Sequence, residues 1–150
     1  MMSADEIFKL CNTIALVSWL ILITATPFWK HTNKFLVGIT ITLFCIIYAW
    51  LIFSNFHAAD FEKFGTLDGV VSLFANKTVV VGGWVHYLAF DLMTGIWITN
   101  NAKQHGINHW IIVPALVFTF MLGPVGLLVY LLIRFAKTKK YFAANYNNIP

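Results

Sequence analysis

The segment VVVGGWVHYLAFDLMTGIWI, residues 79–98, contains a single charged residue, Asp91. A helix needs about 20 predominantly apolar residues to cross a hydrocarbon core about 30 Å thick, so this segment predicts a transmembrane helix. Three further uncharged runs of similar length cover residues 10–28, 35–53 and 110–133. The chain is therefore predicted to be an all-α polytopic membrane protein with four transmembrane helices.

The composition of the 150 residues agrees with this class: 59% are hydrophobic and 11% are charged. Soluble proteins have about 45–50% apolar and about 25% charged residues, so a water-soluble fold is excluded, as are a disordered chain and a nucleic-acid-binding domain. The basic residues lie at or beyond the ends of the apolar runs, as expected near a bilayer. Cys11 and Cys45 fall within the runs, which favours free thiols over a disulfide. We expect a single domain over residues 1–150.

The links between the runs predict two helical hairpins joined by a longer connection. Residues 30–34 and 99–109 are short polar turns, whereas residues 54–78 form the connection. Within it, residues 64–77 place apolar side chains at helical spacing, which predicts an amphipathic helix on the membrane surface; the alternative is a lid over a lateral entrance. With four crossings, seven Lys and Arg residues lie on the side of the termini and three on the other. This bias predicts a cytoplasmic connector and two cytoplasmic termini.

Asp91 is the residue that most directly indicates chemistry. An ionisable side chain at bilayer depth costs at least about 2.5–3.5 kcal/mol, so it needs a partner or a function. His86 lies about 140° from it around a helix, so the two are not a stacked pair. They are candidates for a general acid and base. The alternative is that Asp91 accepts hydrogen bonds from Tyr or Thr groups and holds the helices together.

Two further motifs lie after residue 98. Gly123-Pro124-Val125-Gly126 predicts a kink in the fourth helix, because proline cannot donate its backbone hydrogen bond, and it leaves room for another helix or a flat ligand. His105 and His109 are four apart, but Gly106 separates them and no third ligand is placed nearby. They therefore predict a hydrogen-bonded turn, and we predict no metal site.

Several of these blocks together resemble one family over about residues 67–134. The matching segments are Gly83-Trp84-Val85-His86-Tyr87-Leu88-Ala89-Phe90-Asp91-Leu92, Gly95-Ile96-Trp97, Ala102, His105-Gly106-Ile107, Pro114, Gly123-Pro124-Val125-Gly126 and Arg134. In this combination the chain resembles the abscisic acid deficient 4-like family, which in plants is associated with neoxanthin synthesis. One departure is Asn101, which stands where the family commonly has an acidic residue.

The resemblance implies an isomerase that acts on a carotenoid or related isoprenoid lipid. In the plant reaction an epoxide rearranges to an allenic alcohol without redox change, so no cofactor is needed in principle. His86 and Asp91 are then the candidate catalytic residues. The candidate ligand-binding residues are Trp84, Tyr87, Phe90, Thr94, Trp97, Phe120, Gly123 and Pro124. No plastid transit peptide is evident, which favours a bacterial-type member in the inner (plasma) membrane.

Three other interpretations of the sequence stay open. The protein is also compatible with a non-catalytic accessory protein that holds a carotenoid or lipid for a partner enzyme of isoprenoid metabolism. A small proton or solute carrier that uses Asp91 is another alternative. A structural dimerisation module would use the small residues Gly95, Gly123 and Gly126 but would leave Asp91 unexplained. Four short helices enclose little interior, so a homodimer is compatible with every one of these functions.

Overall fold

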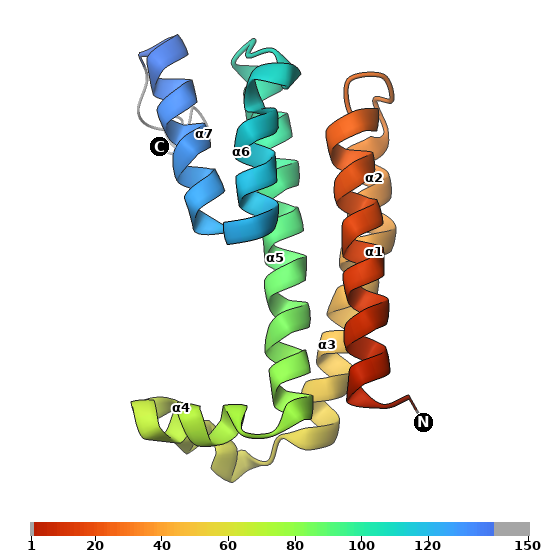
Figure 1. Cartoon of the computed structure of the whole chain (residues 1–150), viewed down its shortest axis with the longest axis vertical. Helices are drawn as coiled ribbons and strands as arrows, with labels where there is room; N and C mark the ends of the chain where they lie inside the picture. Colours follow the sequence, from red (N-terminus) through yellow and green to blue (C-terminus); the bar gives the residue numbers. More distant parts are fainter. Residues whose placement is uncertain (1, 140–150) are drawn as a thin grey trace, which may run out of the picture. The chain divides into compact units, whose positions relative to one another are not determined.

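The structure, a computed structural model, describes residues 2–139 and, of Ala58 and Ala59, the backbone alone. The regular secondary structure of this part of the chain is entirely helical, as predicted, with short links between the helices (Figure 1). In chain order the elements are α1 (Ala4–Ala25), α2 (Thr32–Phe35), the π-helix η1 (Leu36–Ile41), α3 (Thr42–Asn55), the 3-10 helix η2 (Ala58–Gly65), α4 (Leu67–Phe74), α5 (Lys77–Gln104), α6 (His109–Leu122) and α7 (Pro124–Thr138).

Three helical segments in the described residues are long and apolar enough to cross a membrane: α1, the continuous segment Thr32–Asn55, and α5. The shortest of these, α1, has 22 residues. At about 1.5 Å per residue it is about 33 Å long, enough for the hydrocarbon core. The predicted spans over residues 35–53 and 79–98 lie inside two of these segments, and the span over residues 10–28 overlaps α1 except at residues 26–28. The prediction of long apolar helices at these three places is therefore confirmed.

The prediction of one kinked helix over residues 110–133 is wrong. α6 ends at Leu122, and α7 begins at Pro124 and runs back beside α6 (Figure 1). Between them Gly123 has φ +48° and ψ −101°, a conformation that L side chains rarely adopt. Pro124 occupies the first turn of the new helix, where its missing N–H costs nothing. The proline therefore starts a second helix rather than kinking the first.

The α6–α7 hairpin is too short for either arm to cross a bilayer alone. The arms have 14 and 15 residues, or about 21–23 Å each. They pack closely at Gly126, where an added Cβ would overlap the backbone nitrogen of Thr119 and the carbonyl oxygen of Ala115. The described residues thus contain three segments long enough to span a membrane, one fewer than the sequence-based topology requires.

The chain divides into two compact units, which are described separately. The first unit contains Met1–Ser18 and Phe35–Phe90, and the second contains Trp19–Lys34 and the chain from Asp91 onward. In the first unit, α1, α3 and α5 bury a core of Ile7, Cys11, Ala15, Phe44, Leu51, Val81, Val85, Leu88 and Ala89. The buried hydroxyls of Ser18 and Thr40 lie 3.0 Å apart and tie α1 to η1.

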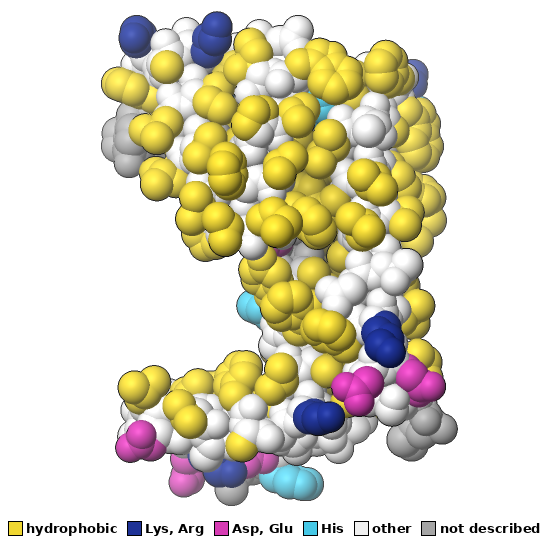
Figure 2. Space-filling model, in the orientation of Figure 1, with side chains coloured by type: hydrophobic (Ala, Val, Ile, Leu, Met, Phe, Trp, Pro, Cys, Tyr) yellow, Lys and Arg dark blue, Asp and Glu magenta, His cyan; other side chains and the backbone are white. Residues whose placement is uncertain are grey.

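The connector, defined here as η2 and α4, contains the amphipathic helix that residues 64–77 predicted. Its side chains separate by type: Figure 2 shows hydrophobic groups along one side and acidic groups along the other. The exposed hydrophobic side chains are Phe61, Phe64, Leu67, Val71 and Phe74. Thr66 caps α4 by accepting from the Gly69 backbone N–H at 3.1 Å. Placement of this helix on the membrane surface stays a prediction.

Candidate functional site

Asp91 lies in α5 and belongs to the second unit, in which it is the only acidic residue of the sequence. Its side chain is half-buried and faces the turn between α6 and α7. A Cβ built on Gly123 would lie 2.8 Å from Asp91 Oδ1 and 3.2 Å from Oδ2. The carboxylate therefore lies at the start of α7, where the partial positive charge of a helix N-terminus favours a negative group.

The other predicted ligand-binding residues of the second unit do not share one set of contacts. Trp97 packs edge-on against Tyr130, with ring centroids 5.7 Å apart. Phe120 packs against Trp19 at 5.5 Å. The remaining two are Thr94, which is half-buried, and Pro124, which is exposed. Of this predicted set, the structure shows Gly123 directly against Asp91.

His86 belongs to the first unit, together with Trp84, Tyr87 and Phe90. Its ring lies 4.5 Å from that of Phe90 and 5.5 Å from that of Tyr48, measured between centroids. Trp84 and Tyr87 form a second ring pair, at 5.3 Å. His86 is exposed and lines a cavity of about 220 Å³. The other lining residues are Tyr48, Ile52, Phe56, Phe64, Phe74, Val79 and Gly83.

The boundary between the two units falls between Phe90 and Asp91. His86 therefore belongs to the first unit and Asp91 to the second. The four aromatic and histidine positions before the boundary form ring contacts within the first unit, and Asp91 contacts the helix break within the second. The catalytic and ligand-binding roles of these residues stay predictions.

A buried polar cluster joins α5 to α7 and was not anticipated from the sequence. Asn101 Oδ1 accepts hydrogen bonds from the Tyr130 hydroxyl at 2.6 Å and from Arg134 Nη1 at 3.2 Å. All three side chains are almost completely buried, with Arg134 1% exposed. Arg134 was expected among the cations at the ends of apolar runs, yet it packs inside the second unit. Tyr130 and Arg134 are four residues apart and therefore lie on the same face of a helix. This spacing of two polar groups in an apolar segment is the feature of the sequence that could have predicted the cluster.

The turn after α5 is hydrogen-bonded through His109, as predicted, whereas the buried His105 Nε2 has no hydrogen-bond partner among the described residues. His109 begins α6, and its Nε2 lies 2.8 Å from the Ile23 carbonyl oxygen at the end of α1. Asn108 caps the same helix by accepting from the Trp110 backbone N–H at 2.9 Å. Among the residues that the structure describes, no group of three or more His, Cys, Asp or Glu side chains could hold a metal ion.

Comparison with known proteins gives one family. Neither the curated proteins nor the solved structures contain a match to the chain. The model of the family described as ABA DEFICIENT 4-like matches residues 6–130, a range that includes the segment Thr32–Asn55, all of α5 with Asp91, the turn at Gly123, and α1 except its first two residues. The match covers most of the 150 residues and extends further toward the N-terminus than the resemblance over residues 67–134. The chain therefore belongs to the ABA DEFICIENT 4-like family.

Proposed function

We propose that this protein binds a carotenoid or a related isoprenoid lipid in the membrane and isomerises it by acid/base chemistry. The observation that carries the proposal is the position of Asp91. Its carboxylate lies against a helix break in a unit that contains no other acidic residue. Membership of a family associated with neoxanthin synthesis supplies the substrate class. A carboxyl group at membrane depth that has a chemical role would explain the cost of placing it there.

The chemistry proposed is a rearrangement without redox change. An acid donates a proton to the epoxide oxygen, and the carbon–oxygen bond opens to give an alcohol. A base removes a proton from a vinylic carbon, and the electron pair of that bond forms the second double bond of an allene. Proton uptake and release balance, so neither oxidant nor reductant is consumed. Asp91 and His86 are the proposed proton-transferring groups.

A binding protein without turnover is the second candidate function. It is favoured by the aromatic cavity of the first unit, in which His86 lies among Tyr48, Phe56 and Phe64. Aromatic walls with few polar groups suit a long conjugated ligand. In this function His86 would orient a ligand hydroxyl rather than transfer a proton, and the bound ligand would be recovered unchanged.

The three spanning segments also lead to a proposed orientation in the membrane. After three crossings, the N-terminal segment and the connector lie on one side with Lys9, Lys63 and Lys77. The opposite side receives Lys30, Lys34, Lys103, Arg134, Lys137, Lys139 and Lys140, of which Lys140 lies outside the described residues. Because cytoplasmic segments carry the excess of Lys and Arg, we propose that this second side is cytoplasmic. This proposed orientation is the reverse of the sequence-based one, in which the connector is cytoplasmic.

The test is turnover of an epoxy-carotenoid such as violaxanthin by purified protein in liposomes. We expect an allenic product of unchanged mass with the wild type, and a loss of at least 100-fold in Asp91→Asn. His86→Gln is tested separately. Asp68→Asn, in the exposed first turn of α4, and His31→Gln, in an exposed link, are matched controls expected to retain activity. Bound but unconverted carotenoid in the wild type would favour the binding protein, and full turnover by Asp91→Asn would overturn its catalytic role.

A further inference from the structure

One cavity of the second unit differs from the apolar surface around it. It lies where the link after α1 meets the end of α5 and the start of α6, and its volume is about 480 Å³. We call it the basic hollow, because Lys30, Lys34 and Lys103 line it together with Asn33, Thr99 and Asn100. Its volume falls within the range of about 300–1,000 Å³ found for small-molecule sites.

The polar wall of the basic hollow is fixed by hydrogen bonds between α2 and α5. Asn33 Nδ2 donates to Thr99 Oγ1 at 3.1 Å and to Asn100 Oδ1 at 2.7 Å. The buried hydroxyl of the neighbouring Thr32 donates to the Trp29 carbonyl oxygen at 2.7 Å. These contacts hold the link in one conformation, so the hollow is built by the fold rather than by mobile side chains alone.

The charge of the basic hollow is of one sign. None of its lining residues is acidic, and none of its three lysines forms an ion pair with a residue in the described part of the chain. By contrast, Lys63 and Lys77 of the first unit pair with Asp60 and Asp5. Three lysines that line one cavity without an acidic neighbour give it a positive potential, which favours binding of an anion.

The basic hollow also has apolar lining residues, among them Pro27, Ile107 and Ile112. Asn33 Oδ1 is buried and has no hydrogen-bond partner among residues 2–139, and because it has almost no accessible surface it is not offered to a ligand. The site thus offers positive charge to an anion and apolar side chains to a hydrocarbon chain.

We propose that the basic hollow binds the phosphate-bearing headgroup of an anionic membrane lipid. It lies at the ends of α1 and α5, both long enough to span a bilayer, so it lies at the depth of the headgroups. The lysines supply positive charge to the phosphate, and the acyl chains lie against the apolar lining residues Pro27, Ile107 and Ile112. This inference does not depend on the proposed isomerase, because Asp91 is not among the residues that line the hollow.

The experiment compares lipid retention by purified protein in nanodiscs of phosphatidylglycerol or phosphatidylcholine, read by native mass spectrometry. We expect the wild type to retain phosphatidylglycerol selectively. The triple variant Lys30→Gln/Lys34→Gln/Lys103→Gln should lose about 10- to 100-fold in affinity, from about fivefold for each lysine reduced by screening. The matched control Lys9→Gln/Lys63→Gln/Lys77→Gln removes the same charge from the first unit and should retain the lipid.

A further arm of the experiment distinguishes a lipid from a soluble phosphate compound. Glycerol 3-phosphate is added as a competitor, and we expect displacement of the lipid only at concentrations far above the lipid affinity, because the soluble compound lacks hydrocarbon chains. Equally tight binding of glycerol 3-phosphate would overturn the lipid assignment. Retention of phosphatidylcholine as strong as that of phosphatidylglycerol would overturn the assignment of the site. A loss of lipid affinity in the control triple variant as large as that in the Lys30→Gln/Lys34→Gln/Lys103→Gln variant would also overturn it. Thermal unfolding of both triple variants separates lost binding from lost folding.

Discussion

The Asp91 carboxylate occupies the space that a side chain at position 123 would need, since Oδ1 lies 2.8 Å from where a Gly123 Cβ would stand. This relationship links a charged group of α5 to the turn between α6 and α7. The turn requires glycine for its backbone conformation, and the carboxylate lies at the start of the following helix. A change at either residue should therefore affect the other.

Gly123→Ala should lower the free energy of unfolding by more than the cost of backbone strain alone. A non-glycine residue in such a conformation costs about 1–3 kcal/mol, and the contact with Asp91 adds to this. Gly106→Ala is the matched control, because Gly106 also has a positive φ, +64°, but has open space around its added Cβ. Unfolding in detergent should show the larger loss in Gly123→Ala, and Asp91→Ala in the same chain should recover the excess. Equal losses in the two glycine variants would contradict the contact.

Asn101 should be the most sensitive member of the buried cluster with Tyr130 and Arg134. Asn101→Leu removes an acceptor shared by two buried donors and should lower the free energy of unfolding by about 3 kcal/mol. Tyr130→Phe removes one hydrogen bond and should cost about 1 kcal/mol. Asn101→Asp keeps an acceptor near the guanidinium and should be tolerated. If chemical unfolding finds Asn101→Leu as stable as the wild type, the cluster does not join α5 to α7.

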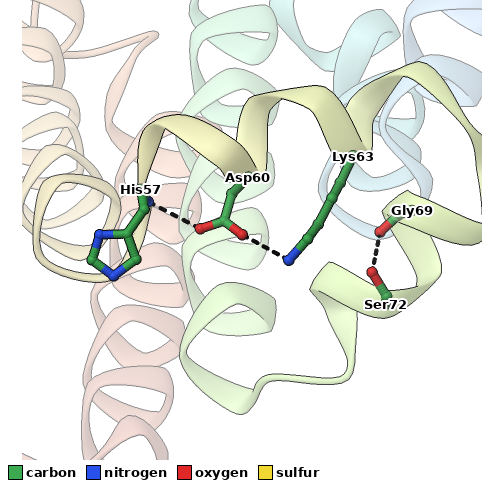
Figure 3. A network of polar contacts seen from close by, with 5 residues as sticks. All are labelled: His57, Asp60, Lys63, Gly69 and Ser72. Carbon is green, nitrogen blue, oxygen red and sulfur yellow. Dashed lines mark hydrogen bonds and ion pairs between the residues drawn. The ribbon is translucent and has the colours of Figure 1, made fainter.

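The connector should lose stability at low pH through Asp60. Its carboxylate accepts from Lys63 Nζ at 2.8 Å and from the His57 backbone N–H at 2.9 Å, and the hydrogen bond from Lys63 is the main reason that the Asp60 pKa lies below its usual value of 3.8 (Figure 3). A lowered pKa in the folded state means that the stabilisation is present above pH 3.8 and is lost as the pH falls through the folded-state pKa.

The pKa of Asp60 can be followed by NMR of its carboxyl carbon. Lys63→Gln should raise that pKa toward 3.8, whereas Lys77→Gln, which removes a lysine paired with Asp5, should leave it unchanged. An Asp60 pKa that does not respond to Lys63→Gln would show that the ion pair does not form in solution.

The N-terminus and the connector should lie on the non-cytoplasmic side and the α6–α7 hairpin should start and end on the cytoplasmic side. The physical reason is the excess of Lys and Arg on the side reached after three crossings. Reporter fusions after residue 139 and within residues 57–66 measure this directly, and they should report opposite sides. If both reporters lay on the same side, the chain would cross the membrane four times, and the α6–α7 hairpin would not return to the side on which it starts.

Three of the four apolar runs in the sequence correspond to helices long and apolar enough to span a membrane, because length and hydropathy are sufficient to identify such segments. The sequence also identified the connector helix from its apolar spacing. The sequence did not predict the turn at Gly123, because a Gly-Pro pair is compatible either with a kink in one helix or with the start of a second helix. Tertiary packing decides between these two structures. Gly126 lets α7 approach Thr119 and Ala115 of α6, and this contact cannot be predicted from the local sequence.

The candidate site was predicted in part. Asp91 was identified because a carboxyl group in an apolar run is costly, and Gly123 because glycine and proline recur around it. The Asn101 cluster was missed, since Arg134 lies at the end of an apolar run and was interpreted as a solvated cation. The basic hollow was also missed, because its lysines come from segments about 70 residues apart in the sequence, Lys30 and Lys34 on one side and Lys103 on the other.

The most direct test of the proposed function is mass spectrometry and absorbance of lipids extracted from the protein purified in mild detergent, beside an unrelated membrane protein from the same cells. The proposal predicts a carotenoid or other isoprenoid enriched in this protein over the control. Retention of phosphatidylglycerol through the basic hollow is a separate signal and is read in the same extract. Phospholipid without any isoprenoid enrichment would contradict an isoprenoid ligand.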